Sequence, residues 1–218
     1  MTRLMRVGAA ALPLLFCVTA SNAAEQGSQW SVLSGRTVGA GQDVIHGQAG
    51  WPGISGTYLH GMSPTVDLGG LFAFNYGVEN STCCIWPELR FAAVGRLNIV
   101  DTPKYNIGIG AQPGLLLFFP GSGRATQVGL GIPLSFAAGF PVSPQVMVVA
   151  GADVAFDIFF TSGSYVVIPI LFGGGVEYMI EHNLLLTFSL RMGPVIGAGS
   201  VSGTTFGLNG LLGIAYKF

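Results

Sequence analysis

Charged residues are scarce in this chain. Asp, Glu, Lys and Arg together make up 9% of its 218 residues, whereas 50% are hydrophobic and the mean hydropathy is +0.60. Soluble domains carry about a quarter charged residues, so a soluble protein of this composition would expose large apolar patches and associate. The composition therefore favours lipid as the solvent. With nine basic and ten acidic residues, the chain also lacks the positive excess of nucleic-acid-binding proteins, and we expect no nucleic-acid partner.

Metal ligands are scarce as well. The chain has three cysteines and three histidines, and two of the cysteines, Cys83 and Cys84, are adjacent. No His, Asp or Glu stands around this pair at the spacing of a zinc site, so we expect no metal and no other cofactor. We interpret the pair as two small apolar loop residues. A disulfide between two molecules is the alternative, provided that the chain is exported to an oxidising compartment.

The N-terminus has the pattern of a secretory signal peptide. Arg3 and Arg6 form a basic region, residues 7–20 form an apolar run, and residues 21–24 are small enough for signal peptidase. The apolar run is too short for a comfortable membrane span. We predict a signal peptide over 1–24, followed by a polar periplasmic lead-in over 25–35.

From residue 36 onwards, apolar and polar residues alternate with the period of two that is typical of strands. In 145–160 the even positions are apolar, and the odd positions include Gln145, Asp153 and Asp157. Short Pro- or Asn-containing turns separate segments of this kind at regular spacing. We predict ten strands, near 36–49, 53–61, 65–77, 87–101, 105–119, 125–140, 145–160, 165–180, 184–199 and 204–218; eight is the alternative if the first two segments do not both belong to the wall.

Hydropathy alone would also allow membrane helices over 105–123 and 127–152, which carry no charge. These stretches contain Pro113, Pro133 and Pro141 together with many glycines, and both residue types destabilise helices. A helical protein would not explain an alternation that keeps its phase from one segment to the next. We therefore favour strands.

The last segment ends on an aromatic residue, with apolar residues at every second position before it: Ile214, Tyr216 and Phe218. Together with the signal peptide and the dyad-repeat strands, this ending resembles the insertion signal of small bacterial outer-membrane β-barrels. The resemblance covers 36–218 and implies an all-β fold, a closed antiparallel up-and-down transmembrane barrel of the Gram-negative envelope. It also implies two partners, outer-membrane lipid and the barrel-assembly machinery that reads the C-terminal strand. It does not indicate an oligomeric state.

Phasing each strand by its apolar face places charged residues inside the barrel. They are Asp67, Glu88, Arg90, Arg96, Asp153, Asp157, Glu177 and Arg191. Reflecting the strands about their turns puts Asp67 opposite Arg96, Asp153 opposite Gly173, and Gly173 opposite Arg191. Because a lone buried charge is costly, we predict one lumen charge network of Asp67, Arg96, Asp153 and Arg191, all at a common level.

Three functions fit this barrel. The first is a structural role in the envelope with a lumen filled by side chains, and the second is a narrow, porin-like passive channel for small solutes. The third is a lipid-modifying enzyme, which would need a Ser/His or acid/His cluster at the outer rim. His46, His60 and His182 do not supply one, and no G-x-S-x-G sequence surrounds a serine. We therefore expect no catalytic residue and no enzyme.

Overall fold

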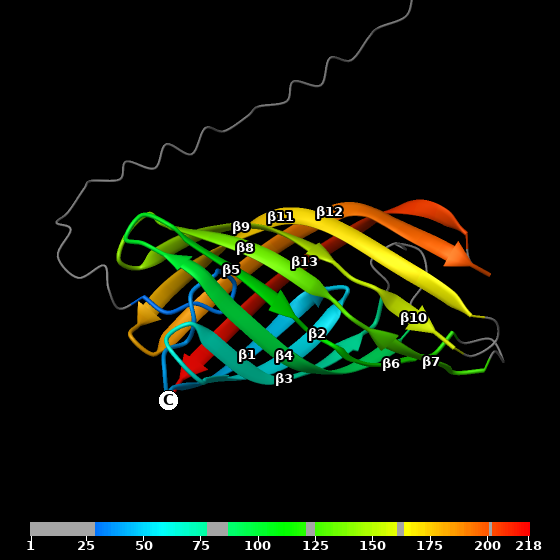
Figure 1. Ribbon diagram of the computed structural model, residues 1–218, viewed down its shortest axis with the longest axis horizontal. Helices are drawn as coiled ribbons and strands as arrows, with labels where there is room; N and C mark the ends of the chain where they lie inside the picture. Colours follow the sequence, from blue (N-terminus) through cyan, green and yellow to red (C-terminus); the bar gives the residue numbers. More distant parts are fainter. Residues whose placement is uncertain (1–28, 78–86, 121–124, 161–163, 201) are drawn as a thin grey trace, which may run out of the picture.

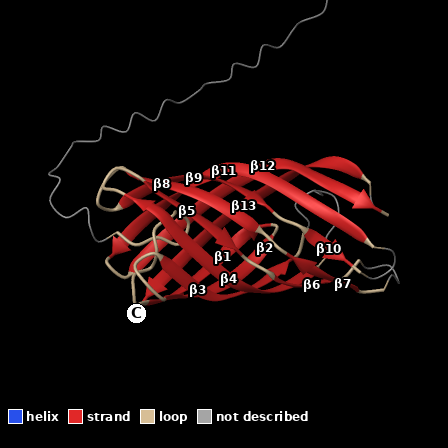
Figure 2. Ribbon diagram, in the orientation of Figure 1, coloured by secondary structure: helices blue, strands red, loops and turns tan. Residues whose placement is uncertain are grey.

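The computed structural model describes residues 29–77, 87–120, 125–160, 164–200 and 202–218, and Figure 2 shows only strands and loops in this part of the chain. The strand segments are β1 (Asp43–Trp51), β2 (Gly53–Gly61), β3 (Val66–Asn75), β4 (Glu88–Asp101), β5 (Asn106–Ala111), β6 (Gly114–Phe118), β7 (Gln127–Gly131), β8 (Leu134–Pro141), β9 (Val146–Val154), β10 (Asp157–Phe159), β11 (Tyr165–Glu181), β12 (Leu184–Gly199) and β13 (Gly203–Lys217). All pairings are antiparallel, and β13 pairs with β1, which closes the sheet into a barrel (Figure 1). Among the described residues, no helix is long and apolar enough to cross a membrane.

The thirteen segments form ten strands, as the sequence predicts, because three of the strands are briefly interrupted. β4 pairs with both β5 and β6, so β5 and β6 are two parts of one interrupted strand. In the same way, β11 pairs with both β9 and β10, which form a second interrupted strand. β7 and β8 form the third interrupted strand. Prolines explain two of the breaks, since proline has no N–H to donate to a neighbouring strand. The carbonyl groups of these prolines still accept hydrogen bonds from neighbouring strands: Ala93 N donates to Pro113 O at 3.0 Å, and Gln112 N donates to Pro133 O at 2.9 Å.

The outer face of the barrel is apolar. The outward-facing positions of β13 and of the terminal Phe218 are the predicted ones: Leu212 and Phe218 are 66% and 59% exposed, whereas the inward-facing Ala215 and Gly207 are buried. The same alternation runs round the other strands, whose exposed residues include Phe72, Leu130 and Phe172. An apolar belt of this kind, with polar residues inside, is the signature of a transmembrane β-barrel.

The two ends of the barrel differ. Four tight turns, at 62–65, 102–105, 142–145 and 182–183, lie at the end that also carries the C-terminus, on the left in Figure 1. We call this the turn end. At the other end, which we call the loop end, β3, β6, β10 and β12 terminate.

The β1–β2 hairpin turns at Pro52 and is shorter than its neighbours. β13 pairs with β1 only from Gly210 onwards, although it pairs with β12 from Gly203.

Two expectations about the wall need correction. The first strand begins at Asp43 rather than at residue 36, because the preceding chain runs inside the barrel and turns into the wall at Gly39 and Gly41, whose positive φ values (104° and 71°) favour glycine. The register between β9 and β11 is shifted by two residues, so that Asp153 lies opposite Leu171 and not opposite Gly173. Slips of two keep each side chain on its own face, so alternation alone does not detect them.

Candidate functional site

Residues 29–38 lie inside the barrel at the turn end, and we call this segment the plug. Trp30, Ser31 and Val38 are 3%, 0% and 1% exposed, and Trp30 and Val38 pack in a core cluster with the wall residues Val44 and Leu185. The predicted lead-in over 25–35 is therefore, from residue 29 onwards, a segment held within the lumen rather than one in the periplasm. Seven of its ten residues are buried, and the backbone polar groups that lie away from water need partners inside the barrel.

Glu177 supplies two of these partners. Its side chain points inward from β11 and is fully buried, and Oε1 accepts hydrogen bonds from Val32 N at 2.9 Å and from Leu33 N at 2.8 Å. Hydrogen bonds to an ionised acceptor contribute about 1.5–3 kcal/mol each. One wall carboxylate thus fixes the middle of the plug.

Arg96 binds the carbonyl groups of the same segment. The guanidinium group donates to Ser31 O at 3.1 Å, to Val32 O at 3.3 Å and to Ser34 O at 3.1 Å, and also to Arg36 O. The planar guanidinium group carries five donors in a fixed fork, which suits it to binding several carbonyl groups at once. Arg96 therefore supplies hydrogen-bond donors to the plug carbonyl groups, and these carbonyl groups supply acceptors to its guanidinium group.

Asp67, next to Arg96 on the neighbouring strand, binds the last residue of the plug. Its two carboxylate oxygens lie 3.2 and 3.3 Å from Val38 N, and Oδ2 lies 3.8 Å from Arg96 Nη1. Asp67 is fully buried. Arg96 balances the charge of Asp67, and such a partner is needed because an unpaired charge in the interior is costly.

The two ends of the plug are tied to the turn end of the wall. Trp30 Nε1 donates to His182 O at 2.9 Å, and Lys217 Nζ lies 5.2 Å from the centre of the Trp30 ring, within the range of a cation–π contact. At the other end, Arg36 Nε donates to Asp101 Oδ1 at 2.9 Å and Nη2 donates to Thr102 O at 3.2 Å. Contacts to β4, β11 and β13 and to two turns thus surround the segment.

Inward-facing glycines make room for the plug. A Cβ atom on Gly108 would come within 2.7 Å of Gly35 Cα, and one on Gly139 would come within 2.6 Å of Ser34 Cβ. Real Cβ atoms essentially never approach so closely. The plug therefore lies directly against the wall at these points, which only glycine permits.

Closer to the loop end, a second group of charges crosses the lumen. Arg90 Nη2 lies 3.2 Å from Asp157 Oδ1, and Arg90 Nε lies 3.8 Å from Glu88 Oε1. Asn75 Nδ2 also donates to Glu88 Oε1 at 3.1 Å. These predicted inward-facing charges compensate one another.

The predicted four-residue network is in fact two separate pairs. Asp67 pairs with Arg96 beside the plug, whereas Asp153 Oδ2 pairs with Arg191 Nε at 3.0 Å on another part of the wall. The prediction of a single level depends on a register that is off by two at Asp153, and it considers wall residues alone. Backbone groups of the plug take up the donors that Arg96 would otherwise offer to other side chains.

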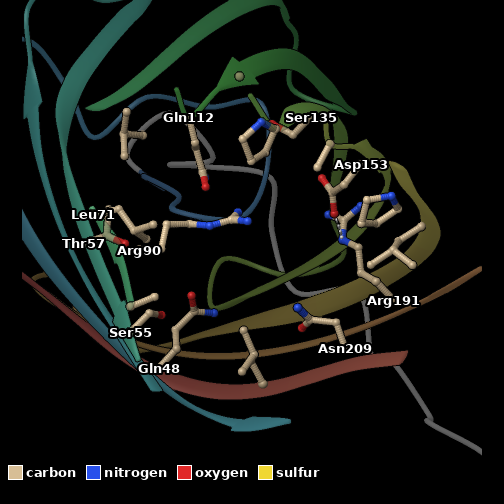
Figure 3. Close-up of a pocket in the computed structure, with 18 of the residues that line it drawn as sticks. Gln48, Ser55, Thr57, Leu71, Arg90, Gln112, Ser135, Asp153, Arg191 and Asn209 are labelled. Carbon is tan, nitrogen blue, oxygen red and sulfur yellow. Dashed lines mark ion pairs between the residues drawn. The ribbon is translucent and has the colours of Figure 1, made fainter. Parts of the chain in front are cut away.

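Between the plug and the loop end, the lumen contains a cavity of about 480 Å³. Its lining includes plug residues 32–35 at one end and Phe118 and Tyr165 near the other. In Figure 3, Arg90 projects into it from one wall, while Arg191 and Asp153 face it from the opposite wall. The barrel is therefore filled at the turn end and hollow beyond it.

The histidines do not form a cluster at the loop end. His46 is 4% exposed and its Nε2 lies 3.0 Å from Thr187 Oγ1 inside the lumen. His60 Nδ1 lies 2.8 Å from Asp43 Oδ1, to which the Tyr58 hydroxyl also donates, at the turn end. Among the described residues, no three His, Cys, Asp or Glu side chains are placed to hold a metal ion. The signal peptide and the pair Cys83 and Cys84 lie outside the described residues.

The sequence predicts the wall side of this site but not the plug. It places Glu177, Arg96 and Asp67 on the inner face, but it pairs only Asp67 and Arg96, with other wall residues, and assigns no partner to Glu177. Two features of the sequence indicate such a segment: Trp30, Val32 and Leu33 make the predicted lead-in over 25–35 more apolar than a solvated linker, and the wall carries glycines such as Gly108 and Gly139, beside which the plug lies.

Comparisons with known proteins add little to this geometry. No family model and no curated protein matches the chain. One solved structure with a related arrangement is described as a KdgM porin; it is 12% identical, the match covers 81% of this chain and 99% of that one, and the TM-score is 0.37. Another comes from work on the in meso crystallization of membrane proteins, with 14% identity, coverage of 82% and 83%, and a TM-score of 0.27. The barrel assignment accordingly stands on the strand pairing and the apolar belt.

Proposed function

We propose that this protein is an outer-membrane β-barrel with a structural role in the envelope, and that its resting lumen is closed to ions. The observation that carries the proposal is the plug: residues 29–38 fill the turn end and are bonded to Glu177, Arg96 and Asp67. Closed barrels are the form in which strands cross a membrane, and a closed lumen preserves the permeability barrier. The proposal includes no catalytic step.

Conductance tests the closure. The refolded chain should give no steady current in a planar bilayer, whereas a chain that begins at Gly39, and so lacks the plug, should conduct. A chain that begins at Gln29 keeps every plug residue and is the matched control, which should stay silent. Steady current from the unaltered protein, equal to that of the shortened chain, would refute the closure and favour a channel.

A narrow channel for small solutes is the second candidate, and the cavity favours it. About 480 Å³ of lumen is already hollow, so removal of the plug alone would lengthen this space towards the turn end. In that case the unaltered protein should show brief openings whose frequency rises when plug contacts are weakened. A structural barrel should show none.

The outer-membrane location is tested separately. Because Arg3, Arg6 and the apolar run predict export, the mature protein should start near Ala24 or Glu25 and fractionate with the outer membrane. N-terminal sequencing that finds Met1 retained in an inner-membrane fraction would contradict both expectations.

A further inference from the structure

The cavity above the plug has the properties of a small-molecule site. Its volume of about 480 Å³ lies in the range of roughly 300–1,000 Å³ that is usual for ligand pockets. The plug closes it on the turn side, where Val32 and Leu33 form part of its lining. A solute that enters from the loop end would therefore stop here rather than pass through.

The wall of this cavity carries hydrogen-bonding groups that have no partner in the described part of the chain. Gln48, Ser55 and Thr57 face it from β1 and β2, and Gln112 and Ser135 face it from the other side of the barrel (Figure 3). None of these five side chains forms a hydrogen bond with another residue of the described chain. Two amides and three hydroxyl groups, each able to donate and to accept, thus converge on one space.

The charges around the same space are compensated. Arg191 pairs with Asp153 at 3.0 Å, and Arg90 pairs with Asp157 at 3.2 Å and lies 3.8 Å from Glu88. Arg96, which pairs with Asp67, also lines the cavity, so three arginines face three carboxylates, which leaves no positive excess to attract an anion. A cation would have to compete with arginines already in place for those carboxylates. The cavity consequently favours an uncharged ligand.

We propose that this cavity binds a small, uncharged, polyhydroxylated solute of monosaccharide to disaccharide size. Each hydroxyl group of such a solute can both donate to and accept from the amides and hydroxyls of the wall. Apolar lining residues such as Leu71, Leu171 and Val195 would contact its C–H surfaces. The proposal rests on the closure by the plug, which gives the site its floor.

Saturation-transfer NMR on the full mature chain in nanodiscs tests the site, with glucose, sucrose and trehalose as uncharged probes. At least one of them should give saturable transfer from protein methyl groups. Glucuronate and glucosamine, which are of similar size but charged, should give weaker transfer. The absence of saturable transfer from all three uncharged sugars, or stronger binding of glucuronate, would overturn the proposal.

The double variant Gln48→Leu/Gln112→Leu locates the binding. Leucine has nearly the same size as glutamine, and the two amide groups that are lost have no partner in the described chain. The barrel should therefore fold and stay heat-modifiable. Sugar binding should weaken at least about tenfold, as expected for the loss of two hydrogen bonds that each change an equilibrium about fivefold. Gln42→Leu, at an exposed residue before β1, is the matched control and should bind normally. Equal binding by the double variant and this control would overturn the site.

The two proposals fail separately. A conducting protein that still binds sugar overturns the closure and keeps the site, whereas a silent protein that binds none of the sugars overturns the site and keeps the closure.

Discussion

The contact between Glu177 and the plug allows a quantitative prediction. Glu177 is fully buried, and its Oε1 accepts two backbone hydrogen bonds, from Val32 N and Leu33 N. Replacing Glu177 by Leu removes the oxygen that accepts both bonds and leaves two part-buried N–H groups without this partner. At about 1.5–3 kcal/mol for each bond to a charged acceptor, the plug should lose about 3–6 kcal/mol of its attachment.

Hydrogen–deuterium exchange measures that loss directly. Where exchange requires local opening, its rate reports the opening equilibrium, and each 1.4 kcal/mol changes that equilibrium tenfold. The amides of Val32 and Leu33 should therefore exchange roughly 10²–10⁴ times faster in Glu177→Leu. Exchange in the strands should change much less, because the wall pairing does not involve this side chain.

Two further variants decide why the plug is held. Glu177→Gln keeps one carbonyl oxygen as a neutral acceptor, and neutral hydrogen bonds are weaker, so its exchange should be intermediate. Glu181→Leu changes an exposed acid on the same strand and should behave like the unaltered protein. If the plug amides exchange as slowly in Glu177→Leu as in Glu181→Leu, apolar packing holds the plug and the proposed role of Glu177 is refuted.

Three other predictions concern the wall. Ala152→Arg should reduce stability by about 2–4 kcal/mol, because the residue faces lipid, whereas Asp153→Asn on the inner face should not abolish insertion; a reversed order in denaturant titrations would mean that the strand phase is off by one. Arg191→Ala should cost roughly 1–3 kcal/mol by leaving Asp153 unpaired, and adding Asp153→Asn should recover part of this in a double-mutant cycle, whereas additive losses would show that the two residues are not coupled. Phe218→Asp should block barrel assembly more than Lys217→Asp, since only Phe218 completes the outer apolar series; equal yields of heat-modifiable barrel would contradict this.

The alternation of residue types was sufficient to predict most of the wall, although not the residue at which its first strand begins. A strand places successive side chains on opposite faces, and in a membrane barrel those faces meet lipid and lumen, so Leu212 and Phe218 could be assigned outward and Glu177 and Arg96 inward from the sequence alone. The strand number followed from the spacing of the turns. Register was less secure, because a shift of two residues leaves every side chain on its own face, and Asp153 was misplaced by this amount.

What fills the lumen was decided only by the tertiary structure. Val32 and Glu177 are 145 residues apart in the chain, and Arg96 lies 64 residues from Val32; no local pattern connects them. An inward carboxylate or guanidinium group must find partners, but the sequence does not say whether these are other wall residues or a separate segment. The closed barrel brings both within reach of residues 29–38, and because backbone N–H and C=O groups buried there need the same partners, the plug and the wall charges satisfy each other.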